Sequence, residues 1–211
     1  MSNVIDKVAN ALYSSGCLQF GSFRIKSGAI SPYYIDLARL LSDPQQLCVI
    51  AQASSEQIRQ IMISSRIDKL ASIELKGALI VPSIACNVNL PCIIVRKEEK
   101  AYGITGKIAG TAVAKGDKIL FFDDVISEGL SKVEGIKQLH ELGGDVEHLL
   151  VVVDREQGGK ERLEKIGYKV HALAKVSEIV NSLCNCKCIS KEQADEVLGF
   201  VRNFKAGNNA H

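Results

Sequence analysis

The residues with the clearest chemical potential lie at 117–132, which read DKILFFDDVISEGLSK. A short apolar run is followed by the adjacent carboxylates Asp123 and Asp124, and then by a turn containing Ser127 and Gly129. Carboxylates at the carboxyl end of a strand suit sugar hydroxyls or a metal ion, because ligands of open α/β sheets bind at that edge. The helical spacing after the turn predicts a helix N-terminus, whose free N–H groups suit an anionic phosphate. An ordinary strand–turn–helix connection with two solvated aspartates fits the same residues, so the motif alone leaves both interpretations open.

Charged loops follow three other predicted strands. They are residues 74–77 after the apolar run 70–73, residues 96–103 after 92–95, and residues 154–159 after 146–153. In a parallel sheet these loops share one edge with the aspartate pair, so a common site can form there. Basic groups around one acidic pair suit a ligand that carries several phosphates and a diol, and a pyrophosphate predicts an accompanying Mg²⁺ ion.

Each of these loops also has a simpler interpretation. Residues 97–100 fit a solvated charged face, Lys76 fits an ordinary helix start, and Arg155 can pair with Asp154 or Glu156. The four histidines lie at unrelated places, and we assign none of them a catalytic role. The occurrence of such groups at four successive strand ends favours a shared functional site.

The bulk composition is that of an ordinary globular protein. The chain has 211 residues, 46% of them hydrophobic and 24% charged, which suffices for one sizeable domain. A net charge of +2 indicates neither a nucleic-acid surface nor an acidic tail. No apolar run approaches the roughly 20 residues of a bilayer span, and the N-terminus does not resemble a signal peptide. We therefore expect a cytoplasmic protein.

Seven cysteines, an odd number without a signal peptide, indicate reduced thiols rather than a disulfide framework. Cys184, Cys186 and Cys188 form a C-x-C-x-C pattern in which a soft metal site is conceivable. No second Cys/His cluster with zinc-finger spacing accompanies them, so metal binding is not the favoured interpretation.

Apolar periodicity alternates between strands and helices from residue 70 onward. Strands are expected at 70–73, 92–95, 119–122, 146–153 and 169–174, and helices at 79–89, 130–142, 159–167, 175–183 and 190–204. Before them we expect a helix over 2–15, short β segments over 18–26 and 31–37, and a long helix over 44–66. Residues 96–110 show no clear periodicity. This alternation predicts an α/β fold in which helices cover both faces of a mostly parallel sheet, with 1–211 as a single domain.

The stretch DDVISEG resembles the phosphoribosyl-diphosphate (PRPP) binding motif of type I phosphoribosyltransferases. Four other segments resemble segments of the orotate phosphoribosyltransferases and follow the order of that family. They are KSGAISPYYID at 26–36, ELKG at 74–77, VRKEEKAYG at 95–103 and VVVDREQGG at 151–159. The resemblance therefore covers most of the chain.

The resemblance implies transfer of the 5-phosphoribosyl group from PRPP to orotate, giving orotidine 5′-monophosphate and pyrophosphate in pyrimidine (UMP) biosynthesis. It implies the type I phosphoribosyltransferase fold, with a five-stranded parallel core and a small hood to which residues 1–40 and 175–205 contribute. It also implies Mg²⁺ as cofactor and a homodimer in which the loop 100–110 of one subunit reaches the other's site. Orotate and PRPP are then the partners, with no nucleic acid and no membrane.

The same resemblance assigns roles to individual residues. Lys100, Asp123 and Asp124 are expected to be catalytic, with Lys100 acting in the partner's site and the aspartates holding the ribose hydroxyls. The residues expected to bind PRPP are Lys76, Arg96, Lys97, Lys100, Asp123, Asp124, Val125, Ile126, Ser127, Glu128, Gly129, Leu130 and Ser131. Those expected to bind orotate are Lys26, Tyr34, Ser127 and Arg155, because a planar guanidinium suits the orotate carboxylate. Mg²⁺ is expected to bind mainly through PRPP, with Asp124 as the candidate protein ligand.

Glu128 and Leu130 depart from the family pattern, which has small or hydroxyl residues at these positions. Because a carboxylate close to a phosphate is unfavourable, we expect Glu128 to point outward, with Lys132 offsetting its charge. These departures keep two alternatives open. One is a regulator of the same fold that binds PRPP or a nucleotide without catalysis, and the other is a phosphoribosyltransferase for another base.

Overall fold

The computed structural model describes residues 4–25, 28–100 and 106–208 of the chain. The first part comprises α1 (Val4–Ser14), β1 (Leu18–Arg24), β2 (Ile30–Ile35), the 3-10 helix η1 (Leu37–Ser42) and α2 (Pro44–Ser64). The middle part comprises β3 (Lys69–Ile73), α3 (Lys76–Val88), β4 (Cys92–Lys100), β5 (Gly106–Gly110), β6 (Lys118–Ile126) and α4 (Leu130–Glu141). The last part comprises β7 (Asp145–Asp154), α5 (Gly159–Lys165), β8 (Lys169–Lys175), α6 (Val176–Asn185) and α7 (Lys191–Asn208). Within these residues, no helix combines the length and apolar composition that a membrane span requires.

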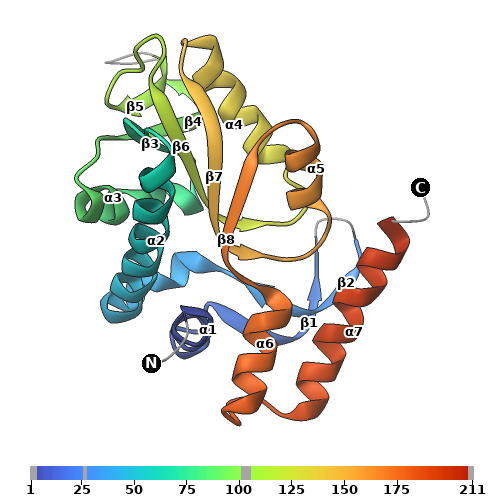
Figure 1. The fold of residues 1–211 in the computed structure, drawn as a ribbon. Coiled ribbons are helices and arrows are strands. Elements are labelled where there is room, and N and C mark those ends of the chain that lie inside the picture. The colour runs from blue at the N-terminus through green and yellow to red at the C-terminus, as the bar shows by residue number, and fades with distance from the viewer. Residues whose placement is uncertain (1–3, 26–27, 101–105, 209–211) are drawn as a thin grey trace.

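A six-stranded sheet in the order β5-β4-β3-β6-β7-β8 forms the centre of the molecule (Figure 1). Its strands β4, β3, β6, β7 and β8 run parallel, and only the edge strand β5 is antiparallel to its neighbour. The chain leaves β3 toward β4 on one side and later continues from β6 toward β8 on the other. The carboxyl ends of β3 and β6 therefore flank a topological switch point, where open α/β sheets bind their ligands. The predicted α/β class with a mostly parallel sheet is confirmed.

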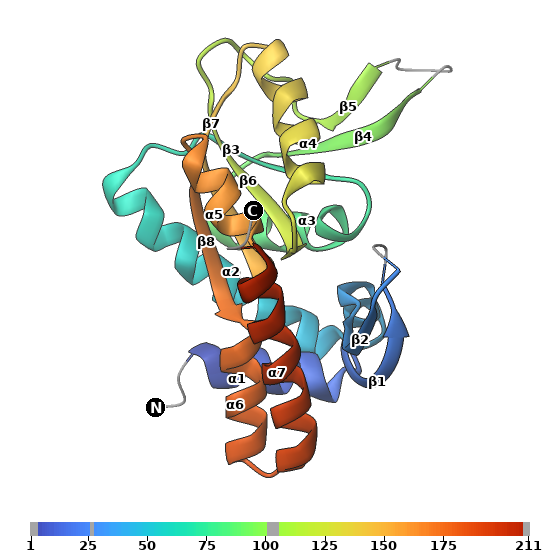
Figure 2. The ribbon, with the colours of Figure 1, turned by 90° about the vertical axis from the view of Figure 1, so that its right-hand side faces the viewer.

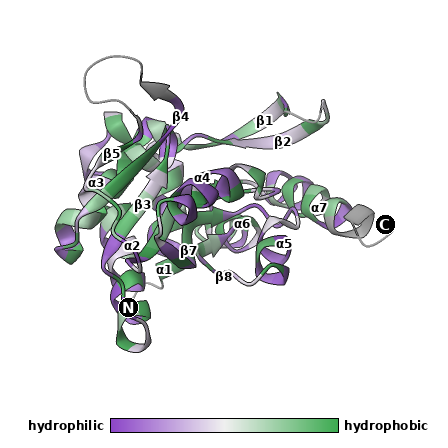
Figure 3. Cartoon of the chain, turned by 90° about the horizontal axis from the view of Figure 1, so that it is seen from above, coloured by the Kyte–Doolittle hydropathy of each residue, from purple (hydrophilic) through white to green (hydrophobic). Residues whose placement is uncertain are grey.

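Both faces of the sheet are covered, as the alternating side chains of β6 show. Leu120 and Phe122 are fully buried in one apolar core, together with residues of α2 and α3. Phe121 and Ile119 lie in a second core on the opposite face, with residues of α4 and α5. In Figure 3, hydrophilic stretches run along α4 and α5, as expected for helices with one face in solvent.

The terminal segments form a second layer of structure beside the sheet. β1 and β2 make a separate two-stranded antiparallel sheet, which stands next to α7 (Figure 2). Tyr33 of β2 is fully buried and meets Phe200 of α7 edge-to-face, with ring centroids 6.0 Å apart. The first core runs without a break from α1 to α7, so these segments share it with the sheet.

Two elements differ from the sequence prediction. The helix expected over 79–89 begins earlier, so Lys76 is the first residue of α3. Residues 96–110, which show no periodicity, include the second half of β4 and all of β5. The pairing of β4 with β5 shifts register between Val95 and Lys100, and this irregularity disrupts the simple alternation that reveals a strand. Lys26 and residues 101–105 of the expected lid lie outside the described residues.

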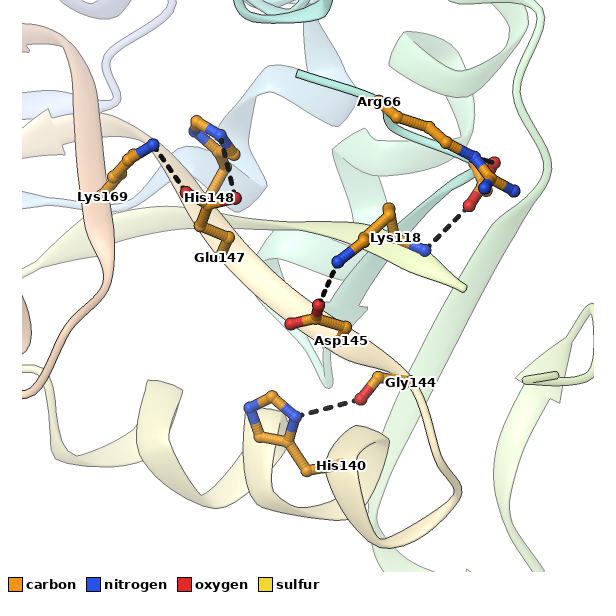
Figure 4. A network of polar contacts seen from close by, with 9 residues as sticks. Arg66, Lys118, His140, Gly144, Asp145, Glu147, His148 and Lys169 are labelled. Atoms are coloured by element: carbon orange, nitrogen blue, oxygen red, sulfur yellow. Dashed lines mark hydrogen bonds and ion pairs between the residues drawn. The ribbon is translucent and has the colours of Figure 1, made fainter. Parts of the chain in front are cut away.

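A network of polar side chains lines the amino-terminal edge of the sheet, opposite the predicted site (Figure 4). Ion pairs join Lys118 at the start of β6 to Asp145 of β7, and Lys169 of β8 to Glu147 of β7. The ring of His148 lies behind this surface, with Nε2 3.0 Å from Ser65 Oγ. Its Nδ1 lies 3.1 Å from Nε2 of His171, and the two rings are stacked. One shared proton satisfies this contact, whereas two protons between the rings repel each other.

The histidine pair predicts a pH-dependent stability. Burial lowers the pKa of both His148 and His171, with their mutual repulsion adding to the effect on His171. The unfolded chain, in which histidine has a pKa of about 6.5, then binds more protons than the folded protein. The contribution of the pair is therefore complete above that pKa and is lost as the pH falls through it. The pair should therefore lower Tm as the pH falls from 7.5 to 5.5, and thermal unfolding followed by circular dichroism measures this against a variant that lacks the pair.

The double variant His148→Asn, His171→Asn isolates this effect, because the change in Tm from pH 7.5 to 5.5 should be more negative in the wild type than in the variant. The comparison is needed because Asp124 acts in the opposite direction. Its raised pKa makes the folded protein bind more protons than the unfolded chain. An equal slope in both proteins would contradict the prediction.

Candidate active site

The two aspartates predicted to carry the chemistry lie side by side in the last residues of β6. Asp123 is 5% exposed and Asp124 is 8% exposed. Asp123 accepts the backbone N–H of Asp124 at Oδ1 over 2.9 Å, and its Oδ2 lies 2.7 Å from Nζ of Lys132. Asp123 is therefore held in one orientation by a buried ion pair.

Lys132 was expected only to offset the charge of Glu128, but the structure brings it to the aspartate pair. Lys132 is 6% exposed, and its ammonium group pairs with Asp123. Besides Asp123, its ammonium group donates to the carbonyl oxygen of Val125 over 2.7 Å. The helical spacing could have predicted this burial. Lys132 lies on the same face of α4 as the buried residues Ile136 and Leu139, at intervals of four and three residues.

Asp124 has an unusual protonation equilibrium. Burial, followed by the negative charge of Asp123, raises the pKa of Asp124 to about 7, although Lys132 acts against this rise. Two buried carboxylates thus share a single buried lysine, so hydroxyl donors or a divalent cation fit beside them. Within the described residues, no cluster of three or more His, Cys, Asp or Glu side chains is arranged to hold a metal. A cation here requires further oxygen ligands from a bound molecule.

The turn after β6 has the geometry of an anion site. Gly129 adopts φ +84° and is the N-cap of α4, and no side chain caps this helix start. A left-handed φ at this position suits glycine. The helix thus begins with N–H groups that lack a side-chain partner, next to the aspartate pair.

Three hydrogen bonds join the β7–α5 loop and α5 to this turn. The backbone N–H groups of Arg155 and Gly159 donate to the carbonyls of Ile126 and Ser127 over 2.9 and 2.8 Å. The guanidinium of Arg162 donates to the carbonyl of Glu128 over 3.1 Å. A Cβ on Gly159 would lie 2.3 Å from the oxygen of Ser127, so only glycine permits this approach. The two loops form one unit.

Among the residues of this segment expected to bind PRPP, some side chains face solvent and others pack into the apolar cores. Glu128, Leu130 and Ser131 are exposed, whereas Ser127 is half-buried. Val125 and Ile126 turn their side chains into the two apolar cores, so a ligand meets only their backbone. The direction of the Glu128 carboxylate relative to a phosphate stays a prediction.

The β3–α3 loop brings Lys76 to the same place. Its Nζ lies 2.9 Å from a carboxylate oxygen of Asp36 and 5.8 Å from the ring centroid of Tyr34. Burial alone would lower the pKa of Lys76, but the hydrogen bond to Asp36 and the charge of Asp124 outweigh it and raise that pKa. A Cβ on Gly77 would lie 2.7 Å from Oδ1 of Asp123, so α3 packs directly against the aspartate pair.

The basic residues of β4 spread outward from the sheet. Arg96 is half-buried, and the N–H of Lys97 donates to Glu74 Oε2 over 3.2 Å, which ties β4 to the β3–α3 loop. Lys100 is the last residue of β4, five positions beyond Val95, where the pairing with β3 ends. At about 3.3 Å per residue this places the Lys100 backbone roughly 16 Å beyond the end of that pairing, where β4 pairs only with β5. Figure 2 shows the β4–β5 hairpin projecting from the body of the molecule.

Arg155 meets Tyr33 on the other side of the acidic pair. Its Nε donates to the tyrosine oxygen over 3.2 Å, and its guanidinium carbon lies 4.9 Å from the ring centroid. The Nη2 of Arg155 is buried without a hydrogen-bond partner, so an incoming carboxylate would satisfy it.

Tyr33 was missed at the sequence level, where Tyr34 was chosen instead. In β2 the two neighbours point to opposite sides: Tyr33 is fully buried at Arg155, and Tyr34 is 38% exposed below Lys76. Strand alternation signals such a division, but it does not tell which face meets the site. Lys26 lies outside the described residues.

Comparisons with known proteins identify relatives over most of the chain. The orotate phosphoribosyltransferase of Pyrococcus horikoshii is 39% identical over 189 residues, which cover 90% of this chain and 98% of that protein. The structure of Leishmania donovani UMP synthase matches 94% of this chain and 42% of that one, with a TM-score of 0.84 and 32% identity. The orotate phosphoribosyltransferase of Aeropyrum pernix matches 83% of this chain and 97% of its own, with a TM-score of 0.73 and 29% identity. A scan against models of protein families found no match.

Proposed function

Because the chain belongs to the orotate phosphoribosyltransferase family, we infer that its site transfers the 5-phosphoribosyl group of PRPP to orotate. The products are orotidine 5′-monophosphate and pyrophosphate, and the enzyme is a pentosyltransferase of pyrimidine biosynthesis. The observation that carries this function is the convergence of three groups at one sheet edge. The acidic pair of β6, the uncapped start of α4 and the half-satisfied guanidinium of Arg155 suit a ribose, a phosphate and a carboxylate, respectively.

In this proposal the β6–α4 segment holds the ribose phosphate. Asp123 and Asp124 accept the 2′- and 3′-hydroxyls, and the N–H groups of 127–131 surround the 5′-phosphate. Lys132 acts behind them, because it fixes Asp123 and keeps the β6 backbone in place. Lys76, Arg96 and Lys97 supply positive charge for the pyrophosphate from the neighbouring strand ends.

Orotate lies between this segment and β2. Arg155 pairs with its carboxylate through the Nη2 group that lacks an internal partner, and Tyr33 holds the guanidinium plane from below. Orotate is already an anion, so no side-chain nucleophile is needed. Catalysis consists of positioning the base against the anomeric carbon and stabilising the charge of the departing pyrophosphate.

A Mg²⁺ ion fits this site, because two buried carboxylates face only one buried ammonium group. Asp124 is the residue that would hold it, together with oxygens of PRPP, and the ion would neutralise charge on the pyrophosphate. The chain's own side chains and backbone N–H groups bind the ribose phosphate and orotate, as described above.

The assembly and location are also part of the proposal. The reach of the β4–β5 hairpin supports a homodimer in which Lys100 acts in the partner's site. β1, β2, α6 and α7 then form the hood over the orotate pocket, within a single phosphoribosyltransferase domain. All seven cysteines are free, which supports a reducing compartment and a cytoplasmic location.

An absorbance assay tests the function directly. Purified protein mixed with PRPP, Mg²⁺ and orotate should deplete the orotate absorbance and release pyrophosphate in equal amounts. Turnover with uracil, adenine, guanine or hypoxanthine in place of orotate would reassign the base. Binding of PRPP in calorimetry without turnover of any base would favour the non-catalytic regulator.

Substituting Gly159 with alanine is expected to damage PRPP binding without touching any substrate contact. The new Cβ would lie 2.3 Å from the Ser127 oxygen and 2.8 Å from the Glu128 carbonyl carbon, which are both backbone atoms. The phosphate turn must therefore move, and a displacement of about 1 Å at a reacting site costs on the order of 100-fold in rate. Steady-state kinetics should show a lower kcat/KM for PRPP.

Gly199→Ala is the matched control, because a Cβ there, in α7, meets nothing within 4 Å. Its kinetics should equal those of the wild type, and its Tm should be equal or slightly higher, because alanine is favoured over glycine inside a helix. Unchanged kinetics in Gly159→Ala would mean that the two loops are not packed as described.

A further inference from the structure

The turn between α6 and α7 brings two thiols into contact. Cys186 ends α6, and its Sγ lies 2.8 Å from the Sγ of Cys188. Both cysteines are exposed. The other five cysteines show no sulfur–sulfur contact among the described residues, so this pair is distinctive within the chain.

The backbone of the turn holds the thiols in this arrangement. Lys187, between them, adopts the left-handed φ of +59°. The N–H of Cys188 donates to the carbonyl of Leu183 over 2.9 Å, and that of Lys187 donates to Cys184 over 3.0 Å. This pattern is a Schellman motif with Lys187 at the C′ position, and it directs both side chains to one side of the turn.

Further contacts fix the two residues individually. The Cys186 Sγ also lies 3.2 Å from the carbonyl of Leu183, and the Cys188 carbonyl accepts the hydroxyl of Tyr13 over 2.9 Å. The thiols are therefore aligned by the fold and open to a reagent in solvent. The contact also raises the pKa of the Cys188 thiol, chiefly through its hydrogen bond with Cys186.

We propose that Cys186 and Cys188 form a reversible thiol–disulfide site, which low-molecular-weight disulfides such as oxidised glutathione oxidise in the folded protein. One thiolate attacks the reagent, whose S–S bond breaks and releases one glutathione thiol. The second cysteine then displaces the remaining glutathione, which leaves as the second thiol. Two cysteine thiols and one glutathione disulfide thus give one protein disulfide and two glutathione thiols, with no other reactant.

The position of Lys187 makes the disulfide easy to detect. Trypsin cleaves after Lys175, Lys187 and Lys191, so the two cysteines fall on the separate peptides 176–187 and 188–191. Folded protein equilibrated with oxidised glutathione should lose two hydrogens in its intact mass. Its non-reducing digest should contain the two peptides as one linked species, which dithiothreitol separates.

Matched serine variants identify the partners. Cys184→Ser should keep the linked species, and Cys48→Ser, an exposed thiol on α2, should keep it as well. Cys188→Ser should abolish it and leave a glutathione adduct on the peptide 176–187. The proposal is overturned if the linkage persists in Cys186→Ser, if wild type acquires only glutathione adducts, or if the disulfide forms only in denaturant. These readouts are masses, so they are independent of the enzyme's turnover.

Discussion

Lys132→Met is expected to lower kcat/KM for PRPP by about 10- to 100-fold, the usual cost of losing a residue that orients a ligand-binding group. Methionine matches the length of lysine but carries no charge, so Asp123 would remain buried without its counter-charge. Removing one partner of a buried ion pair also destabilises a protein by about 3–5 kcal/mol. Steady-state kinetics and urea unfolding measure the two effects separately.

Two further proteins separate a positioning role from general destabilisation. In Lys132→Met, Asp123→Asn the uncompensated charge is absent, so stability should recover in part while PRPP use stays low. Lys137→Met on the same helix removes an exposed lysine whose ion pair with Glu141 spans 3.8 Å, and it should behave like wild type. Wild-type kinetics in Lys132→Met would remove Lys132 from the site.

Lys100→Ala is expected to lower kcat by on the order of 100- to 1,000-fold, because a charge aimed at the departing pyrophosphate is lost. Arg155→Ala should also be nearly inactive, mainly through orotate. If Lys100 acts in the partner's site, a mixed dimer of these two variants contains one complete site. An equal mixture with free subunit exchange should then regain about one quarter of wild-type activity, since half of the dimers are mixed and each has one working site.

The control mixture pairs Arg155→Ala with Asp123→Asn. Both residues belong to the same half of the site, so neither subunit can complete the other and no recovery is expected. Recovery in this control, or its absence in the first mixture, would contradict the shared site. The second outcome would place Lys100 in the site of its own subunit.

The sequence predicted the parts of the site that depend on local pattern. Asp123, Asp124 and Gly129 stand in one strand–turn–helix segment, so their mutual placement follows from adjacency and from the geometry of parallel sheets. Arg155 was predictable as a strand-end residue for the same reason. The fold class followed from the alternation of strands and helices over residues 70–204.

The parts that depend on contacts between distant segments were not predictable in the same way. Tyr33 reaches Arg155 across 122 positions, and which face of β2 meets the site is decided by the packing of β2 against α7. The burial of Lys132 was not predicted, because lysine is rarely buried without a partner and its partner Asp123 lies on another element. The strand pairing over 96–110 was hidden because an irregular edge strand does not alternate.

The hydrogen bonds between the β7–α5 loop and the β6–α4 turn have a thermodynamic consequence. The loop that carries Arg155 and the turn proposed to bind the phosphate share backbone contacts at Ile126 and Ser127. When one substrate orders its segment, it therefore also restricts the segment that binds the other substrate. The protein then loses less conformational entropy when the second substrate binds. The affinities of PRPP and orotate are then linked by one coupling free energy, which by reciprocity is the same whichever substrate arrives first.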